Sequence, residues 1–131
     1  MDKVLILDFG SQVTQLIARR IRKKNIYCEI HPYYISKKQI EDFSPKALIL
    51  SGGPASTTIK KPLKPDTSIY SLNIPILGIC YGHQLLCKHL GGNVINSKKR
   101  EFGKAFIKIK KKSKIFEGIY KKNNEYQVWM S

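Results

Sequence analysis

Residues 75–84 read Pro-Ile-Leu-Gly-Ile-Cys-Tyr-Gly-His-Gln, and this stretch decides the fold. Its apolar first half predicts a buried strand, and the pattern from Gln84 to Leu90 predicts a helix. Between them lies a Gly-x-Cys-x-Gly turn centred on Cys80. A nucleophile on a sharp strand-to-helix turn is typical of the elbow of α/β hydrolytic enzymes. We therefore expect Cys80 at the amino end of a helix, where the partial positive charge favours a thiolate.

The same pattern also fits a purely structural cysteine. A free cysteine is commonly buried as a small apolar side chain, and flanking glycines can serve only to let backbones pass closely. The turn by itself leaves both interpretations open, and the rest of the chain has to decide between them.

Length and composition predict one globular domain spanning residues 1–131. The chain has 131 residues, of which 42% are hydrophobic and 10% aromatic, and it contains no apolar run long enough to span a membrane. Met1-Asp2-Lys3 runs straight into a predicted strand, so no signal peptide is expected. Its three cysteines have no metal-ligand spacing, which predicts no metal site and favours a reducing, cytoplasmic location.

The net charge of +15 raises the question of a nucleic-acid partner. Twenty of the 24 basic residues are Lys and only four are Arg, whereas base readers rely more on Arg. Few aromatic residues lie between the late basic residues to stack on bases. We expect a solvated lysine-rich surface and no nucleic acid, and a contact with another polyanion remains the alternative.

Alternating strand and helix patterns predict an α/β fold with a central, mostly parallel sheet flanked by helices. The helix over 12–24, capped by Ser11, has an apolar stripe of Val13, Leu16, Ile17 and Ile21. Ser36 is expected to cap the next helix, and residues 105–110 alternate as a half-buried antiparallel strand does. The other expected strands are 4–7, 26–30, 47–50, 93–95 and 125–130, and the other expected helices are 36–43 and 67–72.

Three turns follow strands of the predicted parallel sheet: Asp8–Ser11, Ser51–Pro54 and Cys80–Gly82. Ligand sites in such sheets lie at the carboxyl ends of the strands. The glycine turn after residue 50 can point backbone N–H groups at an anion or oxyanion, although a simple tight turn explains it as well. Three such turns at one edge favour a functional site.

These motifs together resemble a known family. Leu7–Gln12, Leu50–Pro54 and Gly78–Gln84 resemble the class I glutamine amidotransferase domain, which has a flavodoxin-like fold. Further stretches are similar to the glutaminase domain of GMP synthases in particular: Thr14–Arg20, Arg100–Gly103 and Val128–Ser131. The resemblance runs from Val4 to the last residue.

The resemblance implies a role for each matching residue. Cys80 would attack the side-chain amide of glutamine, and the backbone N–H groups of Gly53 and Tyr81 would form the oxyanion hole. The implied glutamine-binding residues are Gly52, Gln84, Glu101 and Gly103. No cofactor is expected in this chain. ATP and Mg²⁺ would act on XMP in a synthetase domain or subunit, which is the implied partner.

The sequence departs from the family pattern because the general-base His and its orienting Glu would come after Ser131. The resemblance is therefore to a domain that is incomplete at its C-terminus. His83 is expected to point along its helix, and His31 and His89 are expected to be structural or solvated. We expect weak or no glutaminase activity from these residues alone, and an apolar face of the sheet left exposed.

Three hypotheses follow. The first is a glutaminase domain that needs further residues to turn over. The second is a non-catalytic, truncated relic that binds glutamine or docks a synthetase partner. The third, a basic nucleic-acid binder, rests on charge alone and predicts binding that weakens with salt.

Overall fold

The structure is a computed structural model that describes residues 1–53, 61–99 and 102–130. Four residues of the predicted motifs lie outside these ranges: Pro54, Arg100, Ser131 and the predicted glutamine contact Glu101. The chain divides into two compact units, Met1–Asn96 and Ser97–Ser131, and each is described by itself. Within the described ranges, no helix is long and apolar enough to cross a membrane.

The first unit is built on a four-stranded sheet with the order β2-β1-β3-β4, in which every neighbouring pair is parallel. This confirms the predicted α/β fold with a parallel sheet flanked by helices. Helices alternate with the strands along the chain. The elements in chain order are β1 (Lys3–Asp8), α1 (Thr14–Arg22), β2 (Tyr27–Pro32), α2 (Lys37–Phe43), β3 (Ala47–Leu50), η1 (Thr67–Ser71), β4 (Ile76–Gly78) and α3 (Tyr81–His89).

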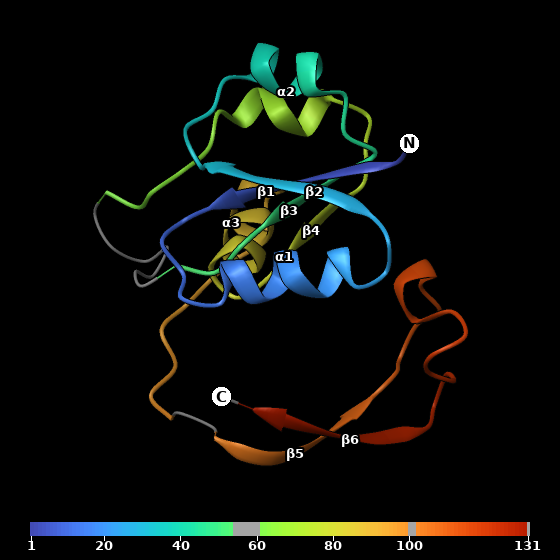
Figure 1. Cartoon of the computed structure of the whole chain (residues 1–131). Coiled ribbons are helices and arrows are strands. Elements are labelled where there is room, and N and C mark those ends of the chain that lie inside the picture. The colour runs from blue at the N-terminus through green and yellow to red at the C-terminus, as the bar shows by residue number, and fades with distance from the viewer. Residues whose placement is uncertain (54–60, 100–101, 131) are drawn as a thin grey trace. The chain divides into compact units, whose positions relative to one another are not determined.

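Alternate side chains of the strands enter two separate cores, one on each face of the sheet. On one face Leu5 and Leu50 pack with Ile40 of α2 and with η1, and on the other Ile6 packs with Ala18 of α1. Figure 1 shows α1 and α2 on opposite sides of the sheet accordingly. We expected an exposed apolar face, and the apolar residue in the middle of edge strand β4, Leu77, is 40% exposed.

Helix α1 differs from its predicted stripe. It begins at Thr14 after an N-cap at Val13, and Ser11 instead accepts a hydrogen bond from the Val13 N–H across a local turn. Val13 and Leu16 are 42% and 51% exposed, whereas the small residues Thr14 and Ala18 are buried. The other two residues of the predicted stripe, Ile17 and Ile21, are partly buried against the same core as Ala18, so this half of the stripe is confirmed.

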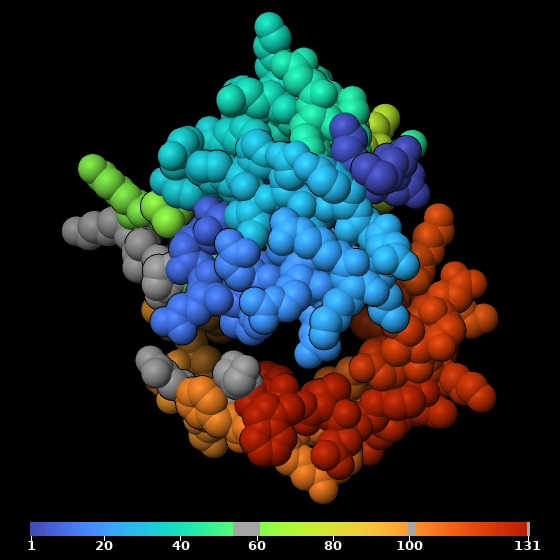
Figure 2. Space-filling model, viewed as in Figure 1, coloured from blue at the N-terminus to red at the C-terminus, as the bar shows by residue number. Residues whose placement is uncertain are grey.

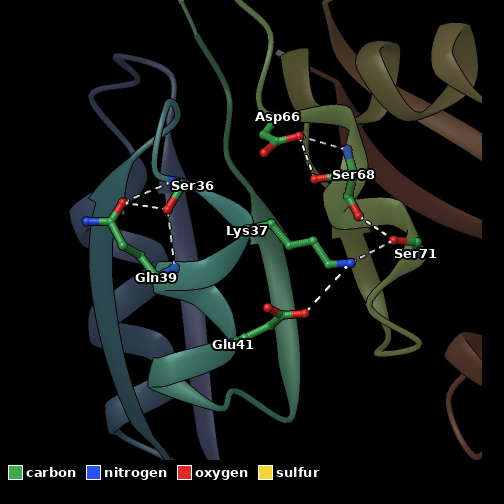
Figure 3. A network of polar contacts seen from close by, with 7 residues as sticks. All are labelled: Ser36, Lys37, Gln39, Glu41, Asp66, Ser68 and Ser71. Atoms are coloured by element: carbon green, nitrogen blue, oxygen red, sulfur yellow. Dashed lines mark hydrogen bonds and ion pairs between the residues drawn. The ribbon is translucent and has the colours of Figure 1, made fainter.

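Helix α2 begins as predicted. The Ser36 hydroxyl accepts from the Gln39 N–H, and the Gln39 side chain accepts from the Ser36 N–H, which completes a capping box. Figure 3 shows how Lys37 then bridges two elements, since its ammonium donates to Ser71 of η1 and lies 3.7 Å from the Glu41 carboxylate. This network joins α2 and η1, which cover the same face of the sheet.

The second unit contains an antiparallel pair, β5 (Gly103–Lys108) and β6 (Glu125–Met130), with η2 (Lys114–Phe116) between them. Half-buried and exposed residues alternate along β5, which confirms a half-buried antiparallel strand. Its lysines are exposed, and long side chains project from the orange and red segment in the space-filling view (Figure 2).

The prediction of a strand at residues 93–95 is wrong, because the structure has no strand there. Ile95 is 77% exposed and Val94 only half-buried. A short β-branched run after a glycine helix stop favours a strand locally, but it becomes one only when a neighbouring strand supplies hydrogen bonds.

Candidate active site

Cys80 is the residue between β4 and α3, and its side chain is exposed. It is the N-cap of α3, with φ 51° and ψ −110°. A positive φ is rare for a residue that carries a Cβ, and such a conformation costs on the order of 1–3 kcal/mol. The predicted elbow is therefore present, and it holds the thiol at the amino end of a nine-residue helix.

Two glycines allow the sharp turn because backbone passes directly over them. A Cβ on Gly78 would lie 2.6 Å from backbone atoms of Gly82 and His83. A Cβ on Gly82 would lie 2.2 Å from the Leu50 carbonyl oxygen at the end of β3. Neither site admits a side chain, so both glycines of the Gly-x-Cys-x-Gly pattern have the steric role predicted for them.

The glycine turn after β3 lies against the elbow. A Cβ on Gly52 would be 3.5 Å from the Cys80 Cβ, and the Gly82 N–H donates to the Ser51 carbonyl at 3.1 Å. Gly53 packs on the turn after β1, because a Cβ there would be 2.8 Å from the Phe9 carbonyl oxygen. All three predicted turns thus meet at the carboxyl edge of the sheet.

A buried polar chain joins the same three segments, and no pattern in the sequence had indicated it. The Thr14 hydroxyl lies 3.0 Å from the Asp8 carboxylate and 3.1 Å from the Ser51 hydroxyl. The Ser51 hydroxyl also accepts from the Phe9 N–H and lies 3.0 Å from the Gly52 carbonyl oxygen. Each member is common at turns and helix starts, so only the assembled fold reveals that they connect.

Aromatic packing supports Tyr81, the first residue of α3. The buried Phe9 ring lies 5.3 Å from the rings of both Tyr33 and Tyr81, measured between centroids. The Tyr81 hydroxyl donates to the Leu63 carbonyl. Burial, and then the neighbouring Tyr33, raises the pKa of Tyr81, so this hydroxyl stays protonated as a donor. The Tyr81 side chain is thus fixed at its ring by Phe9 and at its hydroxyl by Leu63, which limits movement of the Tyr81 backbone next to Cys80.

No histidine is hydrogen-bonded to Cys80 within the described ranges. His31 lies 2.8 Å from Glu29, and the His89 ring is 2.7 Å from the Tyr70 hydroxyl. His83 is exposed on the first turn of α3. These placements confirm that His31 and His89 have structural partners.

Of the remaining predicted glutamine contacts, Gln84 lies in the same unit as Cys80 and Gly103 lies in the other. Gln84 is half-buried on the first turn of α3, where its N–H donates to the Cys80 carbonyl. Gly103 begins β5 in the other unit, whose position relative to Cys80 is not defined. Of the other cysteines, Cys28 is buried in the core, and Cys87 is half-buried. The described residues contain no group of three or more potential metal ligands.

An exposed cysteine on a strand-to-helix elbow, beside a glycine turn at the edge of a parallel sheet, is the nucleophile arrangement of α/β hydrolytic enzymes. The family model for glutamine amidotransferase class-I matches residues 5–131, and the chain belongs to this family.

Within the family, the chain matches the amino-terminal region of GMP synthases. It is 48% identical to the GMP synthase of Bartonella henselae and 52% identical to those of Agrobacterium fabrum and Brucella melitensis. These alignments cover 99% of the chain but only 25% to 26% of the relatives, so the chain spans about a quarter of their length.

A solved structure gives the same result for the fold. A Thermoplasma acidophilum protein described as a GMP synthase subunit superposes with a TM-score of 0.77 at 28% identity. The superposition covers 98% of this chain and 63% of that protein. The resemblance in the sequence motifs is therefore confirmed at the level of the family and of the fold.

Proposed function

We propose that this chain is the glutamine-binding part of a glutaminase that supplies ammonia for GMP synthesis. The observation that carries the proposal is the meeting of Cys80 with the Gly52-Gly53 turn at the sheet edge. Gly53 and Tyr81 N–H groups are the proposed oxyanion donors, and Gly52, Gln84, Glu101 and Gly103 the proposed glutamine contacts.

The chemistry proposed for Cys80 has two steps. Its thiolate attacks the side-chain amide carbon of glutamine, and the oxygen develops negative charge toward the two N–H donors. The C–N bond then breaks, and the nitrogen takes up a proton and leaves as ammonia, which leaves a γ-glutamyl thioester. In the second step water attacks the thioester, the C–S bond breaks, and the proton lost by water returns to the sulfur as glutamate departs.

Both steps need a group that gives or takes a proton, and the described residues provide no histidine hydrogen-bonded to Cys80. This observation favours a second candidate function, in which the chain binds glutamine or docks a synthetase partner without turnover. Under the first candidate, residues outside this chain supply the base.

The ammonia acceptor belongs to the same proposal. The related GMP synthases are about four times as long as the chain, and a synthetase domain in such an enzyme would aminate XMP. ATP with Mg²⁺ would activate the XMP oxygen for displacement there. The described residues of this chain offer no cluster of metal ligands, so we assign no step within it to Mg²⁺.

Labelling with a chloromethyl ketone analogue of glutamine tests the proposal. The thiolate adds to the ketone carbon and the carbonyl oxygen becomes an oxyanion, as in the first step proposed for glutamine. Sulfur then moves to the neighbouring carbon as chloride leaves and the C=O re-forms, so a stable C–S bond remains. Intact mass with peptide mapping reports which cysteine has reacted. We expect Cys80 to react at least about tenfold faster than Cys28 or Cys87, because a bound analogue holds its carbon near the thiol. Free glutamine should protect Cys80.

Two variants serve as controls. Cys80→Ala should abolish fast labelling, and Cys87→Ala, in the same helix, should leave it intact. Uniform slow labelling without protection by glutamine would reject a glutamine site. Selective labelling without ammonia release, even after addition of a polypeptide that carries the family's His and Glu together with the synthetase domain, would support the non-catalytic candidate instead.

A further inference from the structure

We propose that Ser51, held by Thr14 and Asp8, is a positioning residue that sets the direction of the Gly53 N–H. This inference rests on the proposed function, in which that N–H is an oxyanion donor. Ser51 is the last residue before the glycine turn, and its side chain has no solvent-accessible surface.

The peptide between Gly52 and Gly53 has a geometry that links its two polar groups. A trans peptide is planar, and its C=O and N–H groups point in opposite directions. The Ser51 hydroxyl lies 3.0 Å from the Gly52 carbonyl oxygen and can donate to it. Fixing this carbonyl toward the buried hydroxyl therefore turns the Gly53 N–H away from it. Glycine has no side chain that would restrict the orientation of this peptide, so the hydrogen bond from Ser51 fixes the orientation instead.

The Ser51 backbone ties the same turn to the elbow. Its N–H donates to the Leu7 carbonyl, and its carbonyl accepts from the Gly82 N–H at 3.1 Å. One residue thus contacts β1, the first turn of α3 and the Gly52 carbonyl. The two proposed oxyanion donors, the N–H groups of Gly53 and Tyr81, lie within two residues of this connection in the chain.

Thr14 and the Phe9 N–H limit the orientations of the Ser51 hydroxyl. Each hydroxyl has one hydrogen to donate, and the Phe9 N–H already donates to Ser51 Oγ at 3.3 Å. A carboxylate only accepts, so the single Thr14 hydrogen goes either to Asp8 or to Ser51. In the arrangement in which it goes to Ser51, the Ser51 hydrogen is directed at the Gly52 carbonyl. Thr14 and Ser51 are 2% and 0% exposed, so water does not readily replace a lost partner.

The test measures inactivation of the full chain by the chloromethyl ketone analogue and separates kinact from KI. Removing one oxyanion donor typically costs a factor of 10²–10³, so a donor that is only misdirected should cost about tenfold in kinact. We expect this from Ser51→Ala, and a smaller loss from Thr14→Val. KI should change less than kinact, because Gly52 is the only proposed glutamine contact that belongs to the reoriented peptide.

Three controls distinguish positioning from general damage. Thr14→Ser keeps the hydroxyl and should restore kinact, and Ser36→Ala should lower stability through the α2 cap without changing kinact. Iodoacetamide, whose displacement reaction builds no oxyanion, should react with Cys80 of all variants at similar rates. Wild-type kinact in folded Ser51→Ala would overturn the proposal, and Thr14→Val decides the question if Ser51→Ala does not fold.

A second readout does not depend on chemistry at Cys80. The sequence contains only two Gly-Gly peptides, Gly52-Gly53 and Gly91-Gly92. Labelling with glycine that carries carbonyl ¹³C and ¹⁵N therefore gives only two coupled carbonyl–amide signals. The Gly52 carbonyl should move upfield in Ser51→Ala and Thr14→Val, as loss of an accepted hydrogen bond requires, while the Gly91 carbonyl stays fixed.

The two measurements separate the two proposals. If glutamine fails to protect Cys80 but the Gly52 signal moves, the proposed function fails and the positioning of the peptide stands. If glutamine protects Cys80 and the Gly52 signal and kinact are unchanged, the positioning role of Ser51 is wrong.

Discussion

Gly82 shows at the scale of one residue how closely the elbow is docked on the sheet. A Cβ there would meet the Leu50 carbonyl oxygen at 2.2 Å, and backbone cannot rotate aside as a side chain can. We expect Gly82→Ala to lower the free energy of unfolding by about 3 kcal/mol, the upper end of the usual cost of overpacking. Urea unfolding followed by circular dichroism measures this.

Gly91→Ala is the matched control for Gly82→Ala. Gly91 has φ +88°, and a methyl group added there would have no neighbouring atom within 4 Å, so the substitution affects only conformational freedom. It should cost about 1 kcal/mol. An equal effect of the two substitutions would show that the close contact at Gly82 relaxes without cost.

The sequence predicted the elbow residues because their steric requirement is local. Gly78, Cys80 and Gly82 lie within five consecutive positions, and the pattern itself demands a sharp turn. Ser51 and Thr14 could not be predicted in this way. They are 37 residues apart and meet only after β1, β3 and α1 have packed, so no spacing in the chain reports their contact.

At the scale of elements, η1 is joined to the end of α3 by Tyr70 and His89. Burial raises the pKa of Tyr70 to about 12. Burial, and then the charges of Lys64 and Lys88, lowers the pKa of His89 below its usual value. The helix C-terminus favours a cation at this position, but the loss of solvation outweighs it.

This pKa shift predicts a pH dependence of stability. As pH falls below about 6.5, the unfolded chain binds a proton at residue 89 before the folded chain does, so stability falls until the folded-state pKa is reached. Urea unfolding between about pH 7.5 and about pH 5.5 should show a larger loss for wild type than for His89→Gln, which keeps a hydrogen-bonding side chain beside Tyr70. Equal losses would contradict the assignment to His89.

Elements with a local start and stop were predicted well. Ser36 caps α2 through a box that can be recognised from the residue types alone, and Gly91 adopts the positive φ expected after a helix. The failures occurred where tertiary packing decides. Residues 93–95 have strand propensity without a strand, and Leu16 of α1 is exposed because Ala18 makes the sheet contact.

At the scale of the whole molecule, the two units differ in how much core they have. The first contains two apolar clusters on a four-stranded sheet, whereas the second rests on a two-stranded pair, which is marginally stable by itself in water. Hydrogen exchange read by mass spectrometry should therefore be at least about tenfold faster in β5 and β6 than in β1 and β3.

Equal protection of both pairs would contradict this expectation and would mean that β5 and β6 gain support beyond their own pairing. The measurement is best made at two ionic strengths. The chain carries a formal net charge of +15 and only nine acidic residues, so its basic side chains repel one another. Salt screens this repulsion and should slow hydrogen exchange in the second unit, which is rich in Lys, more than in the four-stranded sheet.

The positive φ of Cys80 also means that this residue lowers the stability of the domain. At φ 51° glycine is the residue that folds most stably, because it has no Cβ to resist the turn. Glycine at position 80 would give the more stable domain, whereas the proposed reaction requires the cysteine thiol. Cys80→Gly should therefore raise the free energy of unfolding while abolishing the labelling that the proposed function requires, so stability and the proposed chemistry make opposite demands on this one position.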